Sequence, residues 1–328
     1  HRHWPTDNDN SSTVMMGITM NKFEKTAVTA ILLGASVSAH ALSVTGVTNA
    51  NGASTLIPAL LGPTSGINVV GGSGTYVGAD DQGGTYADFN TVPPENGTLG
   101  DGIVLSSGYA SLVPNTNTDS SWDHNELPPP NNVAPESVAG GSTDDAELSD
   151  ILTKAGAPSS DVNDVNTLEF EFTLDDPTQN AVTANFVWGT EEFPDQGVTD
   201  LFAFIVDGVN FAAFPDGSLI NFDLGSPSAA FYNANEGGAF GIEWDGITDV
   251  LTVTGLLDMS LTTHTIKIAA SDTSDTVFDS AVYIEGLSGT QAKDGGITPP
   301  DGGVPVPAPV FLIGAALLGL GFSRRRRS

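Results

Sequence analysis

The sequence predicts an all-β protein, a jelly-roll-like β-sandwich that also contains two short helices. Short apolar runs, many alternating with polar residues, follow one another along the chain, separated by turns rich in Gly, Asn, Asp and Pro. This spacing is typical of two packed antiparallel sheets. A hydrophobic content of 39% with 16 Phe favours a folded domain over disorder. Because the chain has no Cys, its core rather than disulfides must hold the domain together.

The N-terminal region carries the pattern of a secretory signal peptide. Two lysines after Met20 precede an apolar run, and Ala39 and Ala41 form an A-x-A cleavage site. The pattern predicts a signal peptide over residues 20–41 and export through the Sec machinery. Residues 1–19 show no structural pattern, and we expect them to be a non-native upstream extension.

The strands are predicted from apolar periodicity. The clearest lies at Thr167–Leu174, where Leu168, Phe170 and Phe172 alternate with polar residues. Leu201–Val206 is apolar on both faces, which predicts a central strand. The remaining strands are expected at Ala181–Trp188, Val209–Phe214, Ala239–Trp244, Asp249–Thr254, Thr265–Ala270 and Ala281–Glu285.

Two segments have helical rather than strand periodicity. Ser54–Leu61 carries apolar residues at helical spacing, and Asp144–Lys154 begins with acids and ends with a lysine that a Gly follows two residues later. Long loops are expected at Gly71–Gly84 and Asn115–Gly141. A spacer rich in Gly, Pro and Asp is expected over residues 289–303.

The part of the chain between the terminal segments is strongly acidic. From Leu42 to Gly303 there are 37 Asp and Glu residues against three Lys and no Arg, a net charge of −34. A polyanion of this density repels nucleic acid and anionic lipid, so we expect neither as a partner. It attracts divalent cations, above all Ca²⁺, which prefers carboxylate and carbonyl oxygens. Adaptation to a high-salt habitat would produce the same acidity.

Acidic residues also gather beside two of the predicted strands. Glu191 and Glu192 are adjacent on an extended segment and point to opposite faces, so this pair alone cannot supply the acid and the base of a glycosidase. We therefore expect no catalytic residues. Two interpretations remain, a Ca²⁺ site or turns in which Glu192 and Asp279 accept backbone N–H groups. The predicted calcium site comprises Glu191, Glu192, Asp200, Asp272, Asp275 and Asp279.

Tryptophans are the candidates for stacking on sugars. Trp188 and Trp244 end predicted strands and are expected in the core, whereas Trp122 lies in a Pro-rich loop and is the better glycan candidate. The predicted domain contains only His124 and His264 and no Cys, so no zinc site is expected.

Four stretches of the domain resemble one family. Its start contains STLIPALLG followed by GINVV, and Leu99–Gly108 reads LGDGIVLSSG. Asn185–Gly208 reads NFVWGTEEFPDQGVTDLFAFIVDG, and Asp275–Leu287 reads DTVFDSAVYIEGL. In this order the stretches resemble the choice-of-anchor L domain, here over residues 42–288. The resemblance implies a protein with a surface-attachment signal. Because the family has no well-defined biochemical activity, the resemblance implies no chemistry.

The C-terminal segment, residues 304–328, combines a Pro motif, a short apolar helix and a basic end. The apolar run Val310–Phe322 has 13 residues, which would span about 20 Å as a helix, whereas a permanent membrane span needs about 30 Å. The segment resembles a PEP-CTERM sorting signal, which implies cleavage by an exosortase, a membrane protease. An ordinary tail anchor is the alternative. The residues of the signal are Val304, Pro305, Val306 and Pro307 in the Pro motif and Arg324, Arg325, Arg326 and Arg327 at the end.

The signal peptide predicts export, and the PEP-CTERM resemblance implies a Gram-negative bacterium, with the protein at the cell surface, the outer membrane or the extracellular matrix. The PEP-CTERM resemblance implies a structural or adhesive role in an exopolysaccharide or biofilm matrix, with extracellular polysaccharide as a partner. A secreted hydrolase acting on matrix glycan is the alternative. Two convergent acids in a deep cleft would favour the hydrolase, and an exposed aromatic strip would favour binding.

Overall fold

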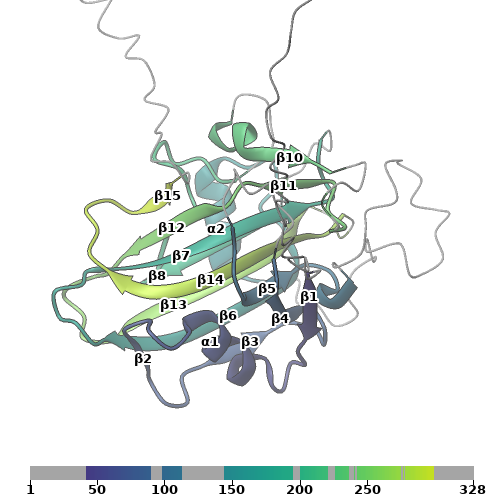
Figure 1. Cartoon of the computed structure of the whole chain (residues 1–328). Coiled ribbons are helices and arrows are strands. Elements are labelled where there is room, and N and C mark those ends of the chain that lie inside the picture. Colours follow the sequence, from purple (N-terminus) through teal and green to yellow (C-terminus); the bar gives the residue numbers. More distant parts are fainter. Residues whose placement is uncertain are drawn as a thin grey trace, which may run out of the picture. The chain divides into compact units, whose positions relative to one another are not determined.

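The computed structural model describes residues 42–89, 98–112, 144–194, 200–220, 226–235, 240, 242–274, 276 and 278–298. The predicted signal peptide, the loop with Trp122, Asp275 and the C-terminal sorting segment lie outside the described residues. The described part consists mainly of two antiparallel β-sheets, as the sequence predicts (Figure 1). Within it, no helix is both long and apolar enough to cross a membrane.

The first sheet has nine described strands, with β7 and β14 at its centre. β14 pairs with β5 on one side and with β7 on the other, and β7 in turn pairs with both β11 and β12. The strands, in the order of the sheet, are β1 (Ser43–Gly46), β4 (Gly83–Ala87), β5 (Gly102–Ser106), β14 (Ser280–Thr290), β7 (Ala181–Thr190), β11 (Gly246–Thr248) and β10 (Tyr232–Ala234), with β12 (Leu251–Leu256) and β15 (Gly296–Thr298) on a side branch.

The second sheet has six described strands and is centred on β13. β13 pairs with β6 on one side and with β8 on the other. The strands, in the order of the sheet, are β2 (Ile67–Val69), β6 (Val162–Leu174), β13 (His264–Thr273), β8 (Leu201–Val206) and β9 (Val209–Asn210), and β3 (Thr75–Val77) also pairs with β6.

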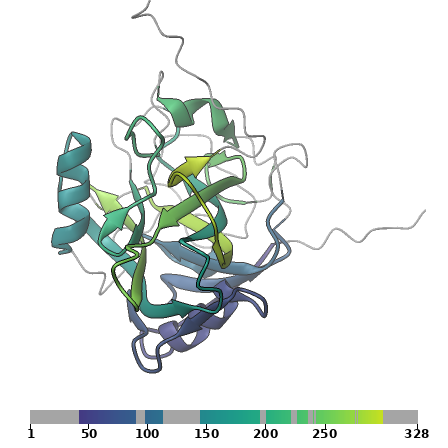
Figure 2. The ribbon, with the colours of Figure 1, turned by 90° about the vertical axis from the view of Figure 1, so that its left-hand side faces the viewer.

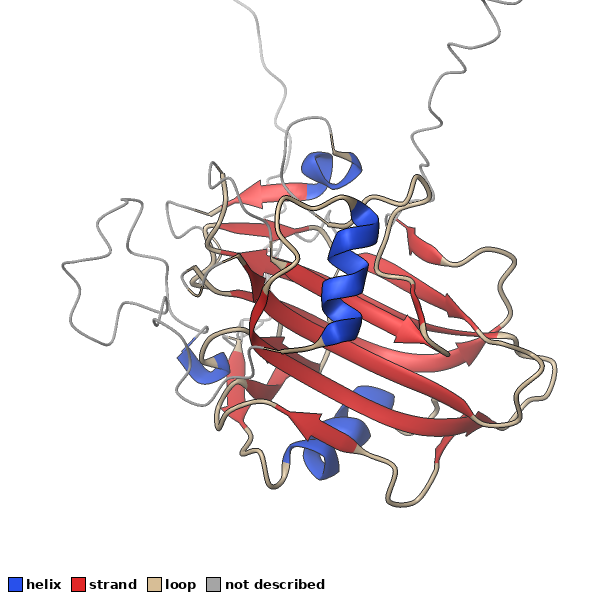
Figure 3. Cartoon of the chain, turned by 180° about the vertical axis from the view of Figure 1, so that it is seen from behind, coloured by secondary structure: helices blue, strands red, loops and turns tan. Residues whose placement is uncertain are grey.

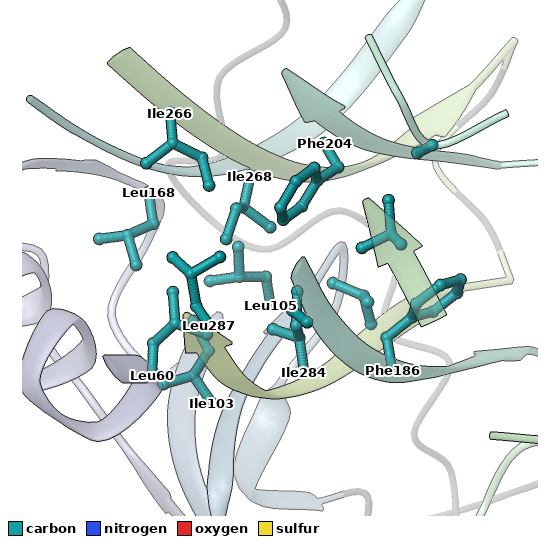
Figure 4. Packing of buried hydrophobic residues seen from close by; sticks show 14 of the residues in the cluster. Leu60, Ile103, Leu105, Leu168, Phe186, Phe204, Ile266, Ile268, Ile284 and Leu287 are labelled. Atoms are coloured by element: carbon teal, nitrogen blue, oxygen red, sulfur yellow. The ribbon is translucent and has the colours of Figure 1, made fainter. Parts of the chain in front are cut away.

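The main core lies between the two sheets. Leu168, Phe170 and Phe172 of β6 are buried in it, whereas Glu169 and Glu171 are exposed, which confirms the predicted alternation. Figure 4 shows how side chains of the second sheet meet those of the first, and the labelled residues include Phe204, Ile266 and Ile268 facing Leu105, Phe186 and Ile284. Dense apolar burial of this kind is the main stabilising term in a fold without disulfides.

Both predicted helices are present, α1 (Gly52–Leu61) and α2 (Ala146–Ala155), on different sides of the sandwich (Figure 2). α1 adds Leu56 and Leu60 to the main core. Two short 3₁₀ helices, η2 (Ala110–Leu112) and η3 (Pro227–Phe231), complete the helical elements of the described part.

α2 begins and ends with the residues that helix termini favour. The Asp145 side chain accepts the backbone N–H groups of Glu147 and Leu148 at 3.0 and 3.1 Å, and Gly156 ends the helix with a φ of 73°. Lys267 of β13 donates to Asp145 at 2.6 Å and to Glu147 at 3.1 Å. These contacts fix the start of α2 against the outer face of the second sheet, across which the helix lies in Figure 3.

The prediction that Leu201–Val206 is a central strand is wrong. β8 lies next to the two-residue strand β9 at one edge of the sheet. All six of its residues are nevertheless buried, because one face joins the main core and α2 covers the other. Leu148 and Leu152 of α2 pack there in a separate apolar cluster, with Leu201, Ala203 and Ile205 of β8. A helix on the outer face therefore produced the continuous apolar pattern.

Four further predictions need correction. The predicted spacer over residues 289–303 contains the last residues of β14 and the strand β15, which pairs with β12. Val209–Phe214 forms a strand only at Val209–Asn210, and the predicted loop Gly71–Gly84 contains β3 and the first residues of β4. The described residues of the predicted strand Ala239–Trp244 form a turn and bends. Ile242 and Trp244 are buried without strand pairing because Asn235 donates to both of their carbonyls, at 2.8 and 2.9 Å. The predicted loop Asn115–Gly141 lies outside the described residues.

Candidate functional site

Carboxylates are buried together at one end of the sandwich, where strands of both sheets begin or end. Asp272 is 0% exposed, Asp279 is 1% exposed and Asp200 is 5% exposed. We call these three residues the carboxylate cluster. Asp164 near the start of β6 and Glu192 just beyond the end of β7 are also buried, each 2% exposed. Few carboxylates in folded proteins are this deeply buried, so the cluster needs a physical explanation.

Strand register brings the cluster together. In the first sheet, Ser280 at the start of β14 pairs with Thr190 at the end of β7, and Asp279 immediately precedes Ser280. In the second sheet, Ser271 of β13 pairs with Leu201 at the start of β8, so Asp272 and Asp200 reach the same end. A bulge at this end of β13 shifts the register between Ala270 and Asp272.

Asp200 links the two sheets through hydrogen bonds. The Ser280 hydroxyl of the first sheet donates to Asp200 Oδ2 at 2.6 Å and lies 2.8 Å from the Thr190 hydroxyl. In the second sheet, the Thr273 backbone N–H donates to Asp200 Oδ1 at 3.1 Å. Asp200 therefore accepts hydrogen bonds from both sheets.

Asp279 is held by the segment that follows β5. The Ser107 hydroxyl donates to Asp279 Oδ1 at 3.2 Å and accepts the Ser280 backbone N–H at 2.9 Å. The Gly108 backbone lies against the same carboxylate so closely that an added Cβ would overlap it. No backbone N–H of the described part donates to the Asp279 side chain, so the turn-capping interpretation does not describe this residue. Its backbone carbonyl accepts the Glu191 N–H at 3.1 Å.

Asp272 is the least satisfied member of the cluster. Neither of its carboxylate oxygens has a hydrogen-bond partner among the described residues, and Asp279 Oδ2 has none there either. Burial, followed by the charges of Asp200 and Asp279, raises the pKa of Asp272 well above its ordinary value, and Ser107 opposes this shift. The pKa of Asp279 is also raised well above its ordinary value, by burial first and then by Asp200. The cluster therefore resists full ionisation unless a cation compensates its charge.

Each lysine of the domain has an acidic partner outside the cluster. Lys154 pairs with Asp150 at 2.5 Å, Lys267 pairs with Asp145 and Glu147, and Lys293 lies 4.0 Å from Asp294. The sequence has no Arg between Leu42 and Gly303, and His264 pairs with Asp207 at 2.8 Å. The described part thus offers no basic side chain to balance the charge of the carboxylate cluster.

The structure brings together part of the predicted calcium site. Asp200, Asp272 and Asp279 meet in the cluster, and Glu192 is buried at the same end. Glu191 is less buried than Glu192, and both lie in bends beyond the end of β7 and not on the extended segment that the sequence predicts. Sequence reasoning missed Asp164, whose φ of 44° lies in the left-handed region that non-glycine residues seldom adopt. No three or more His, Asp or Glu side chains of the described part are arranged around a common metal position.

The tryptophans of the described part are core residues. Trp188 and Trp244 are fully buried, as predicted, and Trp244 Nε1 donates to the Tyr283 hydroxyl at 3.1 Å. A cavity of about 410 Å³ lies between α2 and the β8–β9 edge. Its two carboxylates, those of Glu147 and Asp150, are both paired with lysines.

Comparison with known proteins identifies the domain. No curated protein and no solved structure matches the chain. The model of one family, the choice-of-anchor L domain, matches residues 46–290, which is more than half of the chain and contains every member of the carboxylate cluster. The sequence resemblance placed the domain at residues 42–288, within a few residues of this match. The chain therefore belongs to the choice-of-anchor L domain family.

Proposed function

We propose that the protein is an exported structural or adhesive component of an exopolysaccharide or biofilm matrix. Membership of the choice-of-anchor L family indicates a surface-anchored or exported protein, and the family is not an enzyme family. The two-sheet sandwich, stabilised by a large core without disulfides, suits a structural role outside the cell.

The burial of the acids is the observation that carries this proposal over a hydrolase. A glycosidase needs two carboxylates about 5–10 Å apart on either side of a bound sugar, and both must touch it. Asp200, Asp272 and Asp279 are at most 5% exposed, so a polysaccharide cannot contact them in this conformation. The acids of the cavity beside α2 are engaged by Lys154 and Lys267.

Incubation with the producing organism's polysaccharide tests the two functions directly. We expect the purified protein to co-sediment with the polysaccharide and to release no new reducing ends. Release of reducing ends above the level of a heat-denatured sample would contradict the structural proposal and support the hydrolase. Trp122→Ala should weaken co-sedimentation if the predicted glycan contact exists, and Trp122→Phe, which keeps an aromatic face, serves as the matched control.

The proposed sorting route rests on the sequence of residues 304–328. An exosortase would cut near the Val304–Pro307 motif after the Arg324–Arg327 cluster has fixed the orientation of the tail. Replacing the four arginines with Gln should leave uncut precursor in the membrane fraction, whereas Lys293→Gln in the spacer should not. If mass spectrometry of the wild-type surface protein finds Ser328 still present, the exosortase route is wrong.

A further inference from the structure

We propose that the carboxylate cluster is a divalent-cation site that takes Ca²⁺, with Asp272 and Asp279 as direct ligands and Asp200 as the third negative charge. This deepens the proposed function by giving the exported domain a calcium-dependent stability. It rests on the proposed function in one respect: export places the domain in extracellular fluid, which supplies free Ca²⁺.

Charge balance is the first argument. Moving a carboxylate out of water costs several kcal/mol unless a positive charge or a proton compensates it. Asp200, Asp272 and Asp279 are buried within one cluster, and the lysines and the histidine of the described part are paired elsewhere. A bound divalent cation would supply the missing positive charge from outside the chain.

Unsatisfied oxygen atoms are the second and independent argument. Asp272 Oδ1, Asp272 Oδ2 and Asp279 Oδ2 are buried and have no hydrogen-bond partner among the described residues. Native proteins leave few buried polar atoms without a partner, so such atoms mark the place of a missing ligand. These three carboxylate oxygens would supply part of the six to eight oxygens that Ca²⁺ takes.

The character of the ligands favours Ca²⁺ over other metals. The cluster contains carboxylates and the hydroxyls of Ser107 and Ser280, with no Cys or His in it. The carboxylates are not yet arranged around one metal position. The proposal therefore requires the Asp272 side chain, whose two carboxylate oxygens have no hydrogen-bond partner among the described residues, to turn toward Asp279 when the ion binds. Ca²⁺ accepts irregular coordination of this kind, whereas Mg²⁺ demands near-ideal octahedral geometry.

The position of the ligands predicts what the ion would do. Asp272 belongs to β13 of the second sheet, and Asp279 directly precedes β14 of the first sheet. An ion held by both would close the connection between these strands and join the two sheets at one end. Removing it should therefore destabilise the whole domain and not only a surface loop.

The first test is a thermal unfolding experiment on the full chain after EDTA treatment. At a Ca²⁺ concentration about a hundred times the Kd, binding to the native state should raise the melting temperature by about 5–10 °C. NaCl at equal ionic strength should not reproduce the shift, and MgCl₂ should reproduce little of it. Identical melting with and without millimolar Ca²⁺ would overturn the proposal, because the cluster would then be stabilised by protons alone.

Two isosteric variants locate the site. Asp272→Asn and Asp279→Asn should each weaken Ca²⁺ binding at least tenfold, measured by isothermal titration calorimetry. Glu171→Gln is the control: it removes an exposed charge from β6 in the second sheet, the sheet that contains Asp272, and this variant should bind Ca²⁺ like the wild type. An equal loss in all three variants would show that the ion follows bulk charge, and the proposed site would be wrong.

Terbium luminescence provides a test that does not depend on the folding of a variant. Tb³⁺ binds calcium sites and is excited through nearby aromatic rings. Tyr232 is the candidate ring, because burial first and then the charge of Asp200 raise the pKa of its phenol. The wild type should show saturable emission that Ca²⁺ displaces and NaCl does not. If the wild type shows no such emission, the calcium proposal is wrong, even where the Asp272 and Asp279 variants fail to fold. The proposed surface role would not be affected, because polysaccharide co-sedimentation tests it separately.

Discussion

Replacing Leu152 of α2 with Ala should destabilise the domain strongly, because this side chain covers the outer face of β8. Leu152 is 2% exposed and packs in the apolar cluster that includes Leu148, Leu201 and Ile205. The substitution removes three carbon atoms, at about 0.8 kcal/mol for each buried methylene-sized group, and leaves a cavity. We expect the free energy of unfolding to fall by about 2–5 kcal/mol.

Urea-induced unfolding followed by tryptophan fluorescence measures this loss, since Trp188 and Trp244 are fully buried in the folded protein. The midpoint should fall while the slope of the transition stays constant, because the surface exposed on unfolding hardly changes. Lys154→Ala on the exposed side of α2 is the control and should cost at most about 1 kcal/mol. If Leu152→Ala costs no more than this control, α2 does not stabilise β8 and the reasoning is refuted.

Two further predictions follow from contacts of the fold. Half-burial alone would lower the pKa of Lys267, but Asp145 and Glu147 outweigh it and raise that pKa above its ordinary value of 10.5. A raised folded-state pKa gives stability that is complete below 10.5 and is lost as the pH rises through the folded value. Lys267→Met should therefore lower the free energy of unfolding by about 1 kcal/mol at pH 8. The difference in this free energy between the variant and the wild type should shrink above pH 10.5. A difference that stays constant with pH would contradict the charge explanation. Gly108→Ala should lower stability by about 1–3 kcal/mol, because the new Cβ would overlap the Asp279 carboxylate, whereas Gly71→Ala, where a Cβ meets nothing within 4 Å, should be nearly neutral. Equal melting temperatures for the two Gly variants would show that the packing of Gly108 on Asp279 does not matter.

Apolar periodicity was sufficient to predict most of the fold. The alternation at Leu168, Phe170 and Phe172 located the C-terminal part of β6, which begins earlier than predicted, and helical spacing located both α1 and α2. These predictions succeeded because each depends on which face of an element is buried, and that is written in the local sequence. The predicted strand Ala239–Trp244 was wrong for the opposite reason, since the carbonyls of the buried residues Ile242 and Trp244 accept hydrogen bonds from the Asn235 side chain and not from a neighbouring strand.

The candidate site was only partly predictable. Asp200, Asp272 and Asp279 could be named because they lie beside predicted strands and within the stretches that resemble the family. Asp164 could not, because its place depends on a left-handed backbone conformation within β6. The sequence also could not show that Glu192 is more buried than Glu191. Alternation predicts that neighbouring side chains point to opposite faces, but it does not say which face meets the core.

The sequence by itself determined the all-β class, the two helices, the family and the excess of negative charge, because composition and short-range periodicity encode them. Only the tertiary structure decided that β8 lies near an edge under α2, and that three carboxylates from both sheets are buried together without a basic partner in the described part. The physical reason is that strand order and register join residues far apart in the chain. Asp200 and Ser280 are 80 positions apart in the chain, yet the Ser280 hydroxyl donates a hydrogen bond to Asp200 Oδ2 at 2.6 Å.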